Sequence, residues 1–173
     1  MKTNSLKGIF IFMIAVLLIG NTASTYNSSI IEKIRLTIDE IPAGYVFGQA
    51  PEKAKSLLKD NPWKFDQNAM KNFTNRIYPG ADHRNISDIH MTIIAKKDNP
   101  FGNDIGCYIF IYKNAKSAKD ELRKLNEFIK YNSDRGIVIE KNNLAVYLYI
   151  NDVNNYEHIK RLSEIIKKKL EMI

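Results

Sequence analysis

Two segments in the second half of the chain alternate strictly between aliphatic and aromatic side chains. In residues 105–113, isoleucines and Cys107 take every second position, and Tyr, Phe and Tyr stand between them. Residues 144–150 repeat this pattern with Leu, Val and Ile against two tyrosines. Because successive side chains of a β-strand point to opposite faces, both segments are predicted to be strands. The sheet that they form should have one aliphatic face and one tyrosine-rich face.

The elements around these strands predict the fold class. The strand segments come in two pairs, each joined by a turn: residues 86–96 with 105–113, and 137–140 with 144–150. A helix is expected from Asn114 to about Tyr131 and another from about Asn154, each with one apolar stripe. The order strand–strand–helix–strand–strand–helix indicates an α+β protein. We expect an antiparallel sheet with the helices packed on one face, as a two-layer sandwich. The aliphatic face should meet both helices, with Ile109 and Leu148 buried against Leu122, Leu125, Ile159 and Leu162.

The first half of the chain has shorter patterns. Residues 34–38 (IRLTI) alternate between apolar and polar, which predicts a strand. Two short helices should follow, one opening at Pro51 and one capped by Asp66 over residues 67–77. No Gly, Ser or Pro-rich linker divides the chain into two domains.

The N-terminus has the pattern of a secretory signal peptide. Two lysines precede an uncharged apolar run at residues 8–20, and small or polar residues follow it. A helix that spans a bilayer needs roughly 20 apolar residues, so this run is short for one. We expect residues 1–24 to be a signal peptide, residues 25–33 a lead-in segment and residues 34–173 a single α+β domain. An uncleaved anchor and a buried core helix are the alternatives for the apolar run.

The composition limits the class of protein. A chain with 45% hydrophobic and 26% charged residues is neither wholly disordered nor collagen-like. With Cys107 as its one cysteine, an exported chain cannot close an internal disulfide, so a packed core has to stabilise it. The apolar neighbours of Cys107 indicate a buried small side chain rather than a nucleophile. The expected location is the periplasm or the outside of the cell.

No sequence motif assigns a reaction. The chain lacks the phosphate-binding, dinucleotide-binding, serine-hydrolase, zinc-protease and paired-cysteine motifs, so no cofactor is expected. A polar group around Asp82, His83, Asp88 and His90 offers imidazole and carboxylate ligands. An exported enzyme or metal-binding protein using these residues is therefore the alternative to a binding protein.

The tyrosine-rich face is the main candidate for function. Its expected members lie on three strands: His90, Tyr108, Phe110, Tyr112, Tyr147 and Tyr149. Tyrosine provides contact area together with a hydroxyl, which suits binding of a partner protein, a peptide or a small ligand. The simpler alternative is that residues 42–78 fold across the face and bury it. Our sequence-based hypothesis is a non-enzymatic exported binding protein.

Two other classes of partner have weaker support. Aromatic residues on a sheet in a chain of net charge +7 are also typical of single-stranded nucleic-acid binding. The export signal and the absence of a basic motif flanked by aromatic residues argue against nucleic acid. A membrane could be contacted through an uncleaved N-terminal segment, or weakly through the lysines of the last helix.

Overall fold

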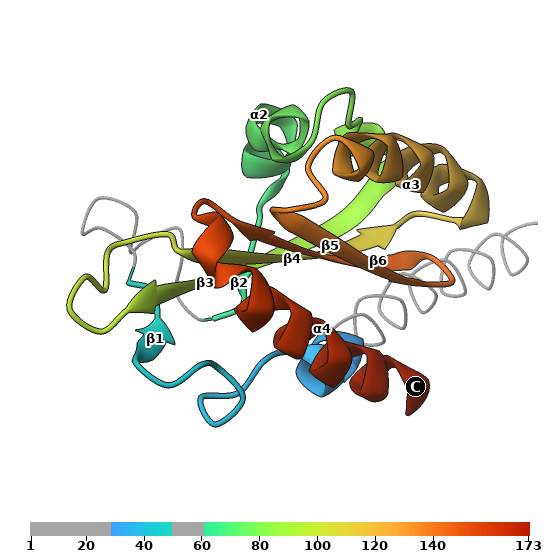
Figure 1. Cartoon of the computed structure of the whole chain (residues 1–173). Helices are drawn as coiled ribbons and strands as arrows, with labels where there is room; N and C mark the ends of the chain where they lie inside the picture. Colours follow the sequence, from blue (N-terminus) through green and yellow to red (C-terminus); the bar gives the residue numbers. More distant parts are fainter. Residues whose placement is uncertain (1–28, 50–60) are drawn as a thin grey trace, which may run out of the picture.

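The computed structural model of the chain describes residues 29–49 and 61–173. This part is an α+β fold built on a six-stranded antiparallel sheet (Figure 1). The strands are β1 (Tyr45–Phe47), β2 (Trp63–Lys64), β3 (Ile86–Lys96), β4 (Ile105–Tyr112), β5 (Gly136–Lys141) and β6 (Leu144–Ile150). Five of them lie in the order β1-β3-β4-β6-β5, and β2 also pairs with β3.

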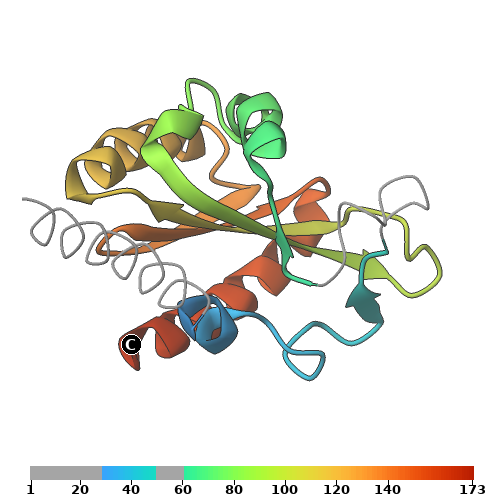
Figure 2. The same ribbon diagram turned by 180° about the vertical axis from the view of Figure 1, so that it is seen from behind.

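Helices cover both faces of this sheet. The helices are α2 (Gln67–Ile77), α3 (Ala115–Lys130) and α4 (Tyr156–Glu171), with short 3-10 helices η2 (His83–Asn85) and η3 (Val153–Asn155). Figures 1 and 2 show α2 and α3 on one face, and α4 beside the helical residues 29–34 on the other. The prediction that the helices pack on one face, as a two-layer sandwich, is therefore wrong.

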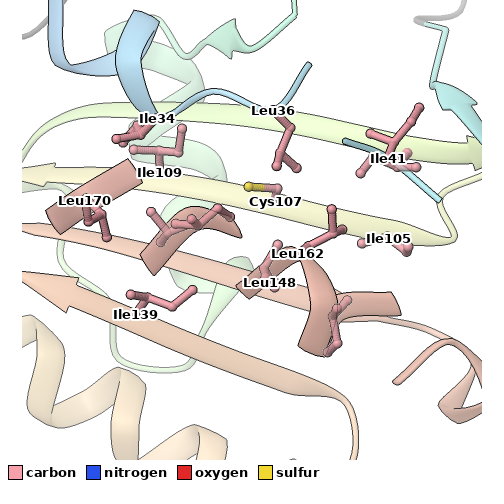
Figure 3. Close-up of a cluster of buried hydrophobic side chains, with 14 of the residues drawn as sticks. Ile34, Leu36, Ile41, Ile105, Cys107, Ile109, Ile139, Leu148, Leu162 and Leu170 are labelled. Atoms are coloured by element: carbon pink, nitrogen blue, oxygen red, sulfur yellow. The ribbon is translucent and has the colours of Figure 1, made fainter. Parts of the chain in front are cut away.

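The two apolar faces of the central strands explain this arrangement. Ile109 and Leu148 belong to an aliphatic core with Ile159 and Leu162 of α4, as expected (Figure 3). Leu125 of α3, which was expected in the same core, packs instead with the aromatic side chains of β4 and β6. Since both faces of these strands are apolar, each face has to be covered by a helix.

Several local predictions are confirmed. β3 and β6 have the predicted bounds, β4 ends one residue earlier than predicted, and β5 is one residue longer at each end. The Asn114 side chain accepts a hydrogen bond from the Ser117 N–H at 2.9 Å, and Asp66 accepts one from the Ala69 N–H at 2.7 Å. These are the N-cap contacts that start α3 and α2. Cys107 is buried in the aliphatic core.

The strand predicted at residues 34–38 is not formed. Residues 29–34 are helical instead, and part of the expected lead-in segment belongs to this helix. Ile31 and Ile34, three residues apart, are both buried in the aliphatic core, whereas Ile38 is 56% exposed. The helical spacing of Ile31 and Ile34 therefore determines the local structure, and the short alternation in residues 34–38 does not.

Gly136 allows α3 to approach the sheet closely. A Cβ atom at this position would lie 2.7 Å from Cδ1 of Ile129 and 3.0 Å from the ring of Tyr147. The last turn of α3 thus packs directly on the start of β5. This contact holds the end of the helix over the tyrosines of β6.

Two sequence predictions fall outside the described residues. These are the signal peptide at residues 1–24 and the helix that opens at Pro51. Among the residues that the structure does describe, no helix is long and apolar enough to cross a membrane.

Candidate functional site

The aromatic face is covered over most of its area. Phe110, Tyr112 and Tyr147 are each at most 1% exposed. Residues of α2 and α3 pack on them together with Tyr78, which meets the Phe110 ring edge to face at 5.7 Å. Part of segment 42–78 thus contributes to the cover, and α3, which was expected on the aliphatic face, supplies another part. Three of the expected binding residues are core residues here.

One end of the aromatic face keeps a group of three tyrosines that we call the tyrosine cluster: Tyr108, Tyr147 and Tyr149. Tyr108 and Tyr147 are direct cross-strand partners whose rings stack at 6.1 Å and 22°. Tyr149 lies next to Tyr147 at 6.1 Å, with its ring tilted by 51°. Tyr108 and Tyr149 are partly exposed, so the cluster is open on their side.

Small and apolar residues surround the cluster on the sheet. Gly106 pairs with Tyr149, and a Cβ atom on this glycine would be 3.2 Å from the ring of Tyr108. The neighbouring strands place three apolar side chains around it: Met91 and Ile93 on β3, and Val138 on β5. The direct neighbours of the cluster on the adjacent strands are therefore uncharged.

The hydroxyl groups of the cluster are its most unusual feature. In residues 29–49 and 61–173, no hydrogen bond joins the hydroxyls of Tyr108, Tyr147 and Tyr149 to another group of the chain. The Tyr147 side chain is 1% exposed, but its hydroxyl is not among the enclosed polar atoms without a partner, whereas the Tyr112 hydroxyl is. By contrast, the Tyr78 and Tyr45 hydroxyls donate to Glu121 and Asn155, each at 2.8 Å. The three cluster hydroxyls can therefore be reached from outside the chain and are able to hydrogen-bond to a ligand or to solvent.

Burial keeps the phenols of Tyr108 and Tyr147 neutral. Burial raises the pKa of Tyr108, and the nearby Tyr149 raises it further. Burial likewise raises the pKa of Tyr147, with additional contributions from Tyr149 and Tyr108. Both phenols stay protonated at physiological pH. They can therefore donate and accept hydrogen bonds but present no charge to a ligand.

His90 lies on the opposite face of the sheet. It pairs with Ile109 of the aliphatic face, so its expected place beside the tyrosines is wrong. Lys64 pairs with His90 across β2 and β3, and its Nζ lies 2.6 Å from Oδ1 of Asp88. Burial lowers the pKa of His90 to about 4, although Asp88 acts in the other direction. The imidazole is neutral at pH 7.

The polar residues proposed for the alternative function do not converge on one site. Asp82 caps η2 and accepts hydrogen bonds from the backbone and guanidinium of Arg84, which lower the pKa of Asp82 to about 2. His83 is 3.9 Å from Asp82, whereas Asp88 and His90 face the aliphatic side of β3. In the described part of the chain, no group of three or more His, Cys, Asp or Glu could hold a metal ion.

Sequence reasoning missed a buried carboxylate on α3. Glu121 is fully buried and accepts four hydrogen bonds, from Tyr78, the Asp82 backbone, Asn85 and Lys124. It lies three residues after Ala118 and four before Leu125, within the apolar stripe of the helix, which is the signal that could have found it. The contacts fasten α3 to the segment between α2 and β3.

Comparisons of the chain with protein-family models, with curated proteins and with solved structures give no match. The tyrosine cluster therefore has to be interpreted from its own geometry and chemistry.

Proposed function

We propose that the protein is an exported, non-enzymatic binding protein that holds an uncharged ligand at the tyrosine cluster. The observation that carries this proposal is the set of three neighbouring hydroxyls without a partner in the described chain. A ligand would hydrogen-bond to these hydroxyls in place of solvent, next to the exposed parts of the rings.

The surroundings of the cluster define the class of ligand. Neutral phenols and an apolar rim of Met91, Ile93 and Val138 favour a ligand without net charge. The partly exposed rings of Tyr108 and Tyr149 offer flat apolar contact area next to the hydroxyls. A small polyhydroxylated molecule or an uncharged peptide segment has both properties.

The alternative, an exported enzyme or metal-binding protein, has less support. Its four residues face different parts of the structure, and Asp82 is already paired with Arg84.

Export itself rests on the signal-peptide pattern of residues 1–24. If that proposal is right, N-terminal sequencing of the extracytoplasmic protein starts between about residues 22 and 27. Intact Met1 on soluble cytoplasmic protein would refute it.

The binding proposal is tested with a variant that lacks the three hydroxyls. Tyr108→Phe, Tyr147→Phe and Tyr149→Phe are combined, and Tyr131→Phe, at a residue that is 89% exposed, serves as the control. Ligand-observed NMR is run on the wild type and on both variants, with neutral disaccharides and N-acetyl amino-acid amides as probes. We expect at least one probe to bind to the wild type and to the control, and not to the combined variant. Equal binding to all three proteins would exclude the cluster as the site.

A further inference from the structure

A groove lies at the opposite end of α3 from Gly136. It has a volume of about 490 Å³ and runs between the first two turns of α3 and the turn that joins β5 to β6. Seven residues line it: Asn114, Ala115, Ala118, Lys119, Leu122, Asn142 and Asn143. The volume is in the range of ligand sites, about 300–1,000 Å³.

The groove has an apolar floor and polar walls. Ala118 is buried and Leu122 is partly buried, and both come from the stripe of α3 that faces the sheet. The wall on the hairpin side is made of Asn142 and Asn143. Asn143 is fixed by its side-chain N–H donation to the Tyr112 carbonyl at 2.9 Å, so this wall is held in place.

Three lysines give this end of α3 a positive charge. Lys113, Lys116 and Lys119 are exposed, and no acidic residue lies between them in the sequence. Within the described residues, none of the three forms an ion pair, whereas the lysines at 124, 167 and 169 all do. Lys119 lines the groove, whereas Lys113 and Lys116 lie beside it at the same end of α3. The exposed Asp120 offsets one of these three charges, and it does not line the groove either.

We propose that this groove docks an acidic peptide segment of a partner protein. An apolar side chain of the segment would sit on Ala118 and Leu122, and flanking carboxylates would pair with Lys113, Lys116 and Lys119. Lys119 in the wall and the exposed Lys113 and Lys116 beside it favour an anionic partner, and the apolar floor favours a segment with an apolar side chain. No aromatic residue lines the groove, so it lacks the stacking surface that single-stranded nucleic acids use.

The test uses the full chain and a defined probe. The probe is a fluorescein-labelled, N-acetylated peptide with the repeat Asp-Leu-Glu, measured by fluorescence anisotropy. The groove variant combines Lys113→Gln, Lys116→Gln and Lys119→Gln. The control removes three charges elsewhere on the surface, with Lys97→Gln, Arg161→Gln and Lys168→Gln, all at exposed positions. Both variants are first checked for wild-type thermal unfolding.

The expected result is at least a tenfold loss of affinity in the groove variant and less than a twofold loss in the control. A peptide with Ser in place of Leu should also bind at least fivefold more weakly, because it cannot fill the apolar floor. Equal losses in both variants would overturn the proposal, because binding would then depend on net charge alone. Tighter binding of an oligothymidylate than of the peptide would overturn it in favour of a nucleic-acid site.

Discussion

Replacing Glu121 with Gln should destabilise the protein strongly. The carboxylate is fully buried and accepts hydrogen bonds from Tyr78 at 2.8 Å, Asn85 at 2.9 Å and Lys124 at 2.6 Å, and a longer one from the backbone of Asp82. Glutamine keeps the shape of the side chain but has one acceptor oxygen and a donor group. At least one of the present donors would therefore face an N–H₂ group.

The magnitude follows from the burial of this group. Removing one partner of a buried ion pair costs about 3–5 kcal/mol, because the remaining charge is left uncompensated. Here the remaining charge is Lys124, whose side chain is 24% exposed, so the lower half of that range is expected. The matched control on the same helix is Glu127→Gln. Glu127 forms an exposed ion pair with Arg123 at 3.0 Å, and such helical pairs contribute about 0.3–0.5 kcal/mol.

The contribution of Glu121 to the free energy of unfolding depends on pH, and its sign follows from the pKa of the carboxyl group. Burial alone would raise the pKa of Glu121, but the hydrogen bonds from Lys124, Asn85 and Tyr78 outweigh burial and hold it below its usual value. A carboxyl group whose pKa is lower in the folded than in the unfolded state stabilises the fold above its unfolded pKa. This contribution disappears as the pH falls through the folded pKa. The gap between wild type and Glu121→Gln should therefore shrink in acid.

Urea unfolding followed by circular dichroism measures these differences at pH 7 and at pH 3. We expect Glu121→Gln to lower the free energy of unfolding by about 3 kcal/mol at pH 7, and by clearly less at pH 3. Glu127→Gln should change it by less than about 0.5 kcal/mol at pH 7. A loss below about 1 kcal/mol for Glu121→Gln at pH 7, or equal losses for the two variants, would refute the reasoning.

Three further unfolding experiments follow from the structure. Tyr147→Phe should lower the free energy of unfolding by less than about 0.5 kcal/mol, because the Tyr147 hydroxyl has no partner in the described chain. Tyr78→Phe loses a hydrogen bond to a buried carboxylate and should lower it by about 1.5–3 kcal/mol. A larger loss for Tyr147→Phe than for Tyr78→Phe would contradict the assignment. Leu148→Ala should cost about 2–5 kcal/mol, and a loss under about 0.5 kcal/mol would mean that Leu148 is not in the core. Gly136→Ala should lower the free energy of unfolding by about 1–3 kcal/mol, because the new Cβ atom clashes with Cδ1 of Ile129. Adding Ile129→Val removes this Cδ1 atom and should restore part of the lost stability. If it restores none, the clash is not with Ile129.

The central sheet could be predicted from the sequence because its signals are local. Alternation of side chains predicted the strands at 105–113 and 144–150, and the side chain of Asn114 predicted the start of α3. Strand periodicity and N-cap chemistry depend on neighbours within a few residues. The separation of aliphatic from aromatic faces on β4 and β6 was also predicted, and the two cores follow it.

The sequence did not show which helix covers which face. Both α3 and α4 have one apolar stripe, and either stripe could pack on either side of the sheet. His90 was placed with the tyrosines, but its register with Ile109 puts it on the aliphatic face. Strand register and helix placement depend on contacts between side chains of different elements, which a single sequence does not reveal.

Titration calorimetry of the best neutral probe against wild type and Tyr147→Phe tests the central claim most directly. A hydrogen bond to the Tyr147 hydroxyl contributes about 0.5–1.5 kcal/mol, so losing it should weaken binding by roughly two- to tenfold. Tyr131→Phe, on the exposed end of α3, should leave the affinity unchanged. Binding at the tyrosine cluster would be contradicted if the probe bound with wild-type affinity both to Tyr147→Phe and to the variant that lacks all three hydroxyls.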